Sequence, residues 1–398
     1  MKLRVFNVGQ ADSLELIPSH NCKFQGKSIL VDCGWGNKDV FPALKNNKIS
    51  LVLSHSDKDH IGGLINLLNS NVTVEDLWLP CYSNEIVKIA NFLLSIKGVS
   101  AISSRSRSVL ELNNVIDGYR FLDSIMRTKR CNNIRLVAKG DKICRHTSVL
   151  NPPLDPDLAL GIEPGASEKY WKEQQNSNYE TIRSWLTPEE FEKQWPYLIS
   201  EGHIKSFSEF MNFTNFNPDF NSLGFDRRMR FIYGFFSKYE SLIDDFVNSG
   251  DSRRFTKIVK ELKLTSNDVS VVLKYKLSTK HDDFSCLLTG DVGKKQLANC
   301  VSDLKNEKIK IFKFPHHGSA NSLDRNVLKK LSPEIVVVSH NNRTYGRQID
   351  PHPSKKVIDA LDKLNIPTAY TNDVIKNGTV VKNKSSTNPH KHVEMVEI

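Results

Sequence analysis

Short apolar runs separated by turn residues characterise the N-terminal part of the chain, 1–153. Runs rich in β-favouring residues predict strands, and helical spacing of apolar positions predicts helices between them. Strands are expected over 3–8, 14–17, 28–32, 49–54, 74–79 and 99–102 and within 140–153, and helices over 40–45 and 85–95. The alternation indicates a mixed α/β start in which polar loops follow the ends of strands.

From 154 to 265 the pattern becomes helical. This stretch holds three of the five tryptophans and many Phe and Tyr residues. The segment 187–190 (TPEE) is typical of a helix start, with a capping threonine, then proline, then glutamate at the third helical position. A long amphipathic helix is expected over 227–247. We therefore predict that 154–265 is a mainly helical insertion.

Strand character returns after the insertion. Strands are expected over 269–275, 284–288, 309–314 and 335–339, followed by a helix over 354–364. The last residues mix Ser, Thr, Asn and Pro with lysine, which is typical of a loosely ordered tail. The predicted organisation is one α/β domain in two halves, 1–153 and 266–381, interrupted by the insertion and followed by a flexible tail, 382–398.

The composition is that of a globular protein of 398 residues, with 39% hydrophobic and 25% charged residues. No window approaches the ~18–20 uninterrupted apolar residues of a membrane span, and the N-terminus lacks the apolar core of a signal peptide. We therefore expect a cytoplasmic protein with no membrane partner. The seven cysteines are scattered and form no CxxC pair, which argues against a disulfide framework or a zinc ribbon. Any metal would be held by His and carboxylate side chains.

The positive charge is unevenly distributed along the chain. The net charge is +10. The stretch 154–265 carries 14 basic and 18 acidic residues, a balance of −4, so the remainder carries 41 basic and 27 acidic residues, a balance of +14. A basic surface attracts polyanions such as nucleic acid. The alternative is a solvated basic surface without a partner.

Four side chains that can bind metal follow the apolar run 51–53, namely His55, Asp57, Asp59 and His60. Imidazole and carboxylate groups are the ligands of hydrolytic Zn²⁺ or Mn²⁺ centres, and a loop after a strand can direct alternate side chains at two ions. The alternative is a polar turn whose side chains cap the next helix. Clustered His and Asp favour the metal site.

Further metal-capable groups follow other expected strands. Asp291 ends the run that includes Thr289-Gly290, His316 and His317 follow another strand, and Asn267 with Asp268 form a further candidate pair. Two divalent ions about 3.5–4 Å apart need a bridging oxygen ligand, and Asp291 is the predicted bridge. Adjacent imidazoles after a buried strand cannot both face the core, so one can bind metal while the other faces the substrate. The alternative for either histidine is a hydrogen-bonded structural role.

Taken in order, these motifs resemble the metallo-β-lactamase-fold hydrolases, and most closely the soluble nuclease-like domain of ComEC-type DNA-uptake proteins. The resemblance covers roughly 1–153 and 266–380. It includes the His-x-Asp-x-Asp-His form of the metal loop, which is a feature of this branch. The matching segments are 6–13, 29–34, 54–63, 267–270, 288–291, 314–319, 345–346 and 350–353.

The resemblance implies an αββα sandwich, in which two β-sheets lie face to face with helices outside, and two divalent ions, Zn or Mn, at one edge of the sheets. By position, the first ion would be bound by His55 and Asp57, the second by Asp59, His60 and His317, and Asp291 would bridge them. Catalytic roles would fall to Asp59, to His316 and to His352, and Ser319, Asn341 and Tyr345 would lie near the substrate.

Two departures from the family pattern bear on the site. Most lactamase-fold enzymes have a further metal-binding histidine where this chain offers only Asn267 and Asp268. An oxygen-rich first site would favour Mn²⁺ over Zn²⁺. The segment 347–350 also interrupts the usual link to the His-Pro motif. The role of His352 is therefore either catalytic or structural.

These observations lead to the hypothesis of a metal-dependent nuclease or phosphodiesterase that cleaves DNA or RNA. A second hypothesis keeps the hydrolase and replaces nucleic acid by a small phosphodiester, a cyclic nucleotide or a lactone. A third makes the chain a subunit of a larger assembly, such as a defence complex, with a protein partner docked on the insertion, 154–265. The aromatic residues of the insertion would then form a docking surface, whereas aromatics at helical spacing usually form a core.

Overall fold

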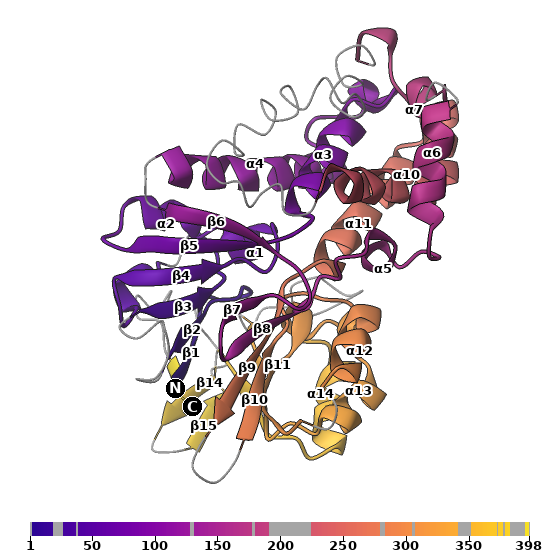
Figure 1. Cartoon of the computed structure of the whole chain (residues 1–398). Helices are drawn as coiled ribbons and strands as arrows, with labels where there is room; N and C mark the ends of the chain where they lie inside the picture. The colour runs from indigo at the N-terminus through magenta and orange to yellow at the C-terminus, as the bar shows by residue number, and fades with distance from the viewer. Residues whose placement is uncertain are drawn as a thin grey trace.

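The computed structural model contains two seven-stranded sheets (Figure 1). It describes residues 2–18, 27–36, 39–127, 131–176, 180–190, 224–278, 283–304, 307–340, 352–371, 373–376, 379–382 and 395–397. Of the predicted site residues, Asn341 and Tyr345 lie outside these ranges.

The first sheet has the strand order β16-β1-β2-β3-β4-β5-β6. Strands β3 to β6 run parallel to one another, while β2 is antiparallel to both β1 and β3. The strands are β1 (Lys2–Phe6), β2 (Leu14–Ile17), β3 (Ser28–Val31), β4 (Lys48–Val52), β5 (Thr73–Pro80), β6 (Cys131–Val137) and β16 (Met395–Glu397).

The second sheet has the order β13-β12-β11-β10-β9-β8-β7. Strands β10 to β13 are parallel, and β7, β8 and β9 are antiparallel. The strands are β7 (Lys142–Cys144), β8 (Thr147–Asn151), β9 (Val272–Ser278), β10 (Asp283–Leu288), β11 (Ile309–Lys313), β12 (Ile335–Val338) and β13 (Thr368–Tyr370), and β14 (Asp373–Lys376) pairs with β15 (Thr379–Lys382) in a separate hairpin. Each sheet thus combines antiparallel strands with a parallel half.

The two sheets pack face to face. One apolar cluster joins Leu16 and Val31 of the first sheet to Leu273 and Ile311 of the second. Side chains alternate along each strand, so Cys286 and Leu288 of β10 enter this cluster while Leu287 faces the other side of its sheet. The chain is therefore a mixed α/β structure with a buried layer between the sheets.

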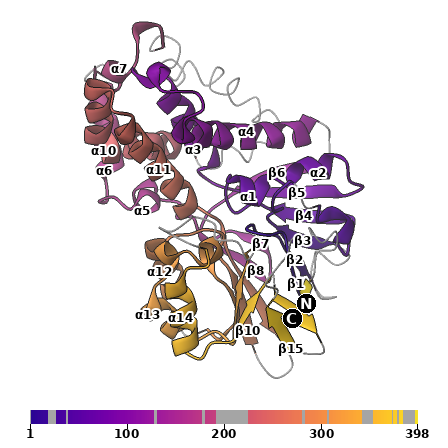
Figure 2. The same cartoon turned by 180° about the vertical axis from the view of Figure 1, so that it is seen from behind.

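Helices cover the two outer faces of the sheets (Figures 1 and 2). The helices near the first sheet are α1 (Lys58–Ile61), α2 (Leu64–Leu68), α3 (Ser83–Leu94) and α4 (Arg107–Arg127), and those on the second sheet are α12 (Lys294–Ser302), α13 (Arg325–Leu331) and α14 (Lys355–Lys363). Short 3-10 helices are η1 (Phe41–Ala43), η2 (Val99–Ala101), η6 (Pro315–Gly318) and η7 (Ala320–Ser322).

The described residues of the stretch predicted as an insertion are mainly helical. Its helices are α5 (Pro156–Leu160), α6 (Ala166–Asn176), α7 (Glu180–Trp185), α10 (Phe225–Ser249) and α11 (Ser252–Asp268). The expected amphipathic helix 227–247 is confirmed as α10, and Thr187 Oγ1 accepts a hydrogen bond from the Glu190 N–H at 3.2 Å, as a helix cap does.

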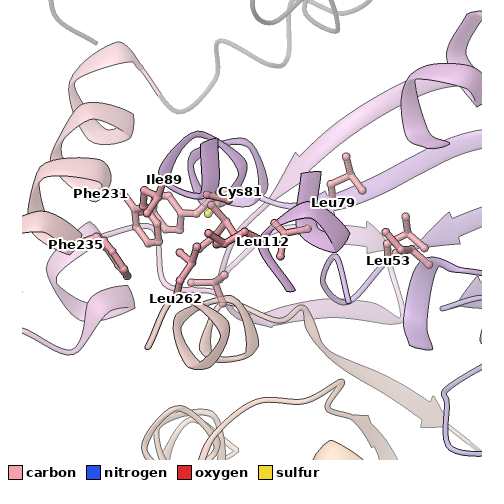
Figure 3. Close-up of a cluster of buried hydrophobic side chains, with 14 of the residues drawn as sticks. Leu53, Leu79, Cys81, Ile89, Leu112, Phe231, Phe235 and Leu262 are labelled. Atoms are coloured by element: carbon pink, nitrogen blue, oxygen red, sulfur yellow. The ribbon is translucent and has the colours of Figure 1, made fainter. Parts of the chain in front are cut away.

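The aromatic residues of α10 belong to the core. Phe231 and Phe235 are fully buried in one cluster with Ile89 of α3, Leu112 of α4 and Leu262 of α11 (Figure 3). The same cluster extends to the outer face of the first sheet. These aromatics are therefore not available as a docking surface.

Three features of the N-terminal part differ from expectation. The segment 99–102 is not a strand, because Gly98, with φ of 86°, turns the chain into η2. Helix α4 and strand β6 were not predicted, since polar residues and Gly118 interrupt the apolar spacing of 107–127.

Among the residues described, no helix combines the length and the apolar content needed to cross a membrane.

Candidate metal centre

Asp32 anchors the loop that carries the predicted ligands. It follows β3 with a positive φ of 59°. Its Oδ1 accepts a hydrogen bond from the Ser54 N–H at 2.7 Å, and its Oδ2 accepts one from Ser54 Oγ at 2.7 Å. The same carboxylate lies 2.8 Å from Nδ1 of His60. A carboxylate at Nδ1 holds the proton there and leaves the Nε2 lone pair of His60 directed into the site.

One group of donor atoms surrounds Oδ1 of Asp291. Nε2 of His60 lies 3.3 Å from this oxygen and Nε2 of His317 lies 3.9 Å from it. Oδ2 of Asp59 lies 3.1 Å from His317 Nε2 and 3.9 Å from His60 Nε2. With metal–ligand bonds of about 2.0–2.1 Å in a tetrahedron, neighbouring donors lie about 3.3 Å apart. These four separations, of 3.1–3.9 Å, are close to that spacing.

A second group of donor atoms surrounds Oδ2 of the same aspartate. Nε2 of His55 lies 4.0 Å from Asp291 Oδ2, and Nε2 of His316 lies 3.8 Å from it. Oδ2 of Asp57 lies 3.8 Å from His55 Nε2. The two oxygens of Asp291 thus face different sets of side chains, and His316 contributes an imidazole on the side of His55.

Unsatisfied buried atoms show that these residues fit a metal ion. Nε2 of His55, Nε2 of His60 and Oδ1 of Asp291 are buried, and within the described part of the chain none has a hydrogen-bond partner with good geometry. Leaving such atoms unpaired costs about 1–3 kcal/mol each. Asp12, His60, Asp291 and His317 each offer a ligand atom within 4.8 Å of the others, so this buried group could hold a metal ion.

A left-handed turn delivers the two adjacent histidines from β11. His316 and His317 have φ of 50° and 52° within η6, a conformation that costs energy for residues other than glycine. The His316 N–H donates to the carbonyl of Gly290 at 3.2 Å, which ties this turn to the turn before Asp291. His317 is buried, whereas the side chain of His316 is 26% exposed. The strained turn is stabilised by its neighbours and places both rings beside Asp291.

Asp12 and Lys313 form a buried ion pair behind the site. Lys313 Nζ lies 2.7 Å from Asp12 Oδ2, and both side chains are 1% exposed. Oδ1 of Asp12 lies 3.6 Å from Nδ1 of His317. Asp12 therefore places a negative charge beside the ring of His317, without a hydrogen bond to it.

The carboxylates and imidazoles perturb one another. Burial alone would lower the pKa of His60, but Asp291, Asp32 and Asp59 outweigh it and raise that pKa well above its usual value. Burial would raise the pKa of Asp291, but the nearby histidines hold it well below its usual range. Burial lowers the pKa of His316 to about 4. The Asp291 carboxylate is therefore kept ionised, positive charge is favoured at His60, and His316 is kept neutral.

Two of the candidate ligands are not where the sequence placed them. Asn267 and Asp268 were expected at a strand end, but they end helix α11, because the helix continues beyond 265 and β9 begins only at Val272. Asp268 Oδ1 accepts a hydrogen bond from the Gly293 N–H at 3.1 Å. Asp268 is therefore a partner of the turn after Asp291.

Two further predicted site residues, His352 and Ser319, are buried. The ring of His352 is 4.8 Å from that of His316, centroid to centroid, and is buried. Ser319 is also buried, and its Oγ accepts a hydrogen bond from the Asn321 N–H at 3.2 Å. Its hydroxyl therefore has a backbone partner at the start of η7.

Asp12 and Asp32 lie within the matching segments 6–13 and 29–34, but the sequence patterns assigned no role to them or to Lys313. The sequence pattern did indicate the position of Lys313. In the run IKIFKF at 309–314, this lysine falls on the same face of the strand as Ile311. Strand alternation would have placed it between the sheets.

No protein-family model matches the chain. Among curated proteins, the chain is similar to ComE operon protein 3 of Bacillus subtilis (strain 168), with 31% identity over 98 residues. The match covers 24% of this chain and 12% of the length of that relative. This partial similarity gives some support to the ComEC-like resemblance of the motifs.

Proposed function

We propose that the chain is a metal-dependent phosphodiesterase of the metallo-β-lactamase fold that hydrolyses nucleic acid. The observation that carries the proposal is Asp291, whose two carboxylate oxygens face two separate sets of imidazole and carboxylate donors. One carboxylate shared between two sets of donors is the arrangement that a dinuclear hydrolytic centre requires.

We propose that the first ion is held by His55, Asp57 and His316, and the second by Asp59, His60 and His317, with Asp291 shared. Divalent ions in these positions would lower the pKa of water and stabilise negative charge on the attacked phosphate. His316 supplies the imidazole for which the sequence around 267–268 offered no candidate. The expectation that His316 contacts the substrate is revised accordingly.

The protein's own groups would keep these ligands in position. Asp32 holds the proton on Nδ1 of His60, and Asp12, paired with Lys313, lies beside Nδ1 of His317. Because these partners are buried, the rings cannot turn away from the site without leaving buried charge uncompensated. His352, in ring contact with His316, positions that histidine.

The arrangement of strands also supports the proposal. The metal loop follows β4, Asp291 follows β10, and the two histidines follow β11, so ligands from both sheets meet at the carboxyl ends of parallel strands. Two sheets packed face to face with helices outside agree with an αββα sandwich. The part of the chain outside 154–265 carries a net charge of +14, which favours a polyanionic substrate.

The test is a cleavage assay with purified protein, Mn²⁺ or Zn²⁺, and single-stranded, linear duplex and plasmid nucleic acids. The wild-type protein is expected to cleave only with metal, and Asp291→Asn is expected to lose at least about a hundredfold in rate, because the shared carboxylate loses its charge. Asp303→Asn, at a partly exposed aspartate paired with Lys139, is the matched control. Absence of metal-dependent cleavage, or equal cleavage by Asp291→Asn, would contradict the proposal.

A further inference from the structure

A cavity of about 420 Å³ opens beside the metal loop. Asp57 and Asp59 line it from the loop, Arg105 and Arg107 line it from the start of α4, and Lys263 lines it from α11. The cavity therefore lies next to the candidate metal centre and receives side chains from two helices outside the sheets. Its volume falls in the range of roughly 300–1,000 Å³ that is usual for ligand sites.

The two arginine side chains of this cavity are placed to bind a phosphate group. Arg107 Nε lies 2.8 Å from Glu111 Oε1, but the arginine side chain is 88% exposed. Exposed ion pairs of this kind contribute little, so a phosphate can replace the carboxylate. Arg105 is exposed, and its guanidinium has no ion pair or hydrogen bond among the described residues. Both arginines precede or begin helix α4, whose N-terminus attracts anions.

Lys263 connects the cavity to the metal ligands. Its Nζ lies 3.4 Å from Oδ2 of Asp57, and its side chain is 41% exposed. Burial would raise the pKa of Asp57, but Lys263, followed by His55, lowers it. The lysine therefore already contacts the metal loop while remaining accessible to a ligand in the cavity.

The cavity also has an aromatic and aliphatic wall. Trp35 lines it, and its indole Nε1 donates a hydrogen bond to the Gln10 carbonyl at 2.7 Å. This bond fixes the ring, so little conformational entropy is lost when a flat group packs against it. Leu110 of α4 lines the cavity with 48% of its surface exposed. A site with fixed indole, exposed leucine and arginines suits a ligand that has both a flat ring and a phosphate.

We propose that this cavity is a nucleotide subsite that binds one unpaired nucleotide of a single strand next to the scissile phosphate, with Arg105 and Arg107 on a phosphate and Trp35 against the base. This inference rests on the proposed nuclease function and names its substrate as single-stranded nucleic acid. A base within a duplex is stacked and paired, so it cannot reach Trp35 without being extruded. Stacking on an aromatic ring combined with basic groups along the backbone is how proteins hold single strands.

The test measures binding of a fluorescently labelled single-stranded oligonucleotide by anisotropy in EDTA, where a metal-dependent enzyme cannot cleave it. Arg105→Ala/Arg107→Ala is expected to raise Kd about tenfold and to reduce the slope of log affinity against log salt by about 0.7, because one neutralised phosphate is lost. Arg253→Ala is the matched control, because Arg253 is 89% exposed, pairs with Asp251, and lies about 15 Å along α11 from Lys263. The control is expected to bind as the wild type does.

A second measurement tests the base contact without altering the protein. The wild type is expected to bind an abasic single strand, and a duplex of the same length, at least about fivefold more weakly than the normal single strand. Equal affinities for all three nucleic acids, or unchanged affinity and salt slope in Arg105→Ala/Arg107→Ala, would overturn the subsite. Because binding is measured without turnover, a protein that binds as expected but never cleaves with metal would overturn the proposed function and leave the subsite standing.

Discussion

The candidate metal centre is supported by three individual residues, Asp32, Asp12 and Lys313. Each lies behind the candidate ligands, and each is nearly inaccessible to solvent. Asp32 contacts Ser54 and His60, and Asp12 lies between Lys313 and His317. The sequence showed which His and Asp residues cluster along the chain. It could not show which carboxylates lie behind them, because that depends on how β1, β3 and β11 are placed in three dimensions.

The buried Asp12–Lys313 ion pair gives a prediction for a single-residue change. Lys313→Met is expected to lower the free energy of unfolding by about 3–5 kcal/mol, because it leaves the buried Asp12 carboxylate without its partner. The measurement is urea unfolding followed by circular dichroism. Lys308→Met is the matched control, since Lys308 pairs with Glu334 at the surface, and its loss is expected to cost less than about 1 kcal/mol.

The double variant Asp12→Asn/Lys313→Met completes this test. Removing both charges is expected to recover much of the lost stability, because no isolated charge remains buried. If Lys313→Met is as stable as Lys308→Met, the buried Asp12–Lys313 ion pair does not contribute to stability as proposed.

At the scale of elements, β4, β10 and β11 could be predicted because apolar runs end in polar loops. The strand expected at 269 was placed too early, since α11 continues to Asp268. A helix end and a strand end both leave polar residues after an apolar run, and local sequence does not distinguish them. Helix α4 was missed because polar residues and Gly118 interrupt the apolar spacing of 107–127.

The packing of α10 predicts that the helices and the sheets unfold together. Phe235 is fully buried in the cluster that includes the outer face of the first sheet. Phe235→Ala is expected to cost about 3–5 kcal/mol by leaving a cavity, and the helices and sheets are expected to unfold in one transition. The exposed Leu264 of α11 provides the control, because Leu264→Ala removes little buried surface.

Unfolding of this pair of variants is followed by differential scanning calorimetry. Two separate transitions, of which Phe235→Ala shifts only one, would contradict a shared core. That outcome would instead indicate that α10 forms an independently folding unit.

At the scale of the whole molecule, the two sheets bring together segments that are far apart in the chain. Asp59 and His317 lie 258 positions apart in sequence and 3.1 Å apart in space. The boundaries of the insertion, 154–265, remain our proposal, and the helices described within it pack on the same side as α3 and α4. Through Lys263, α11 also reaches the metal loop. The helical part is thus proposed to shape the substrate cavity.

Asp291 is proposed to be shared by two metal sites, and the number of metal ions bound per chain tests this sharing. Protein dialysed against Mn²⁺ or Zn²⁺ is analysed by inductively coupled plasma mass spectrometry beside His55→Asn and His317→Asn. Two ions per chain are expected for the wild type and one for each variant, because each variant removes a ligand from a different side of Asp291. A wild-type chain that binds one ion or none, or variants that both retain two, would contradict it.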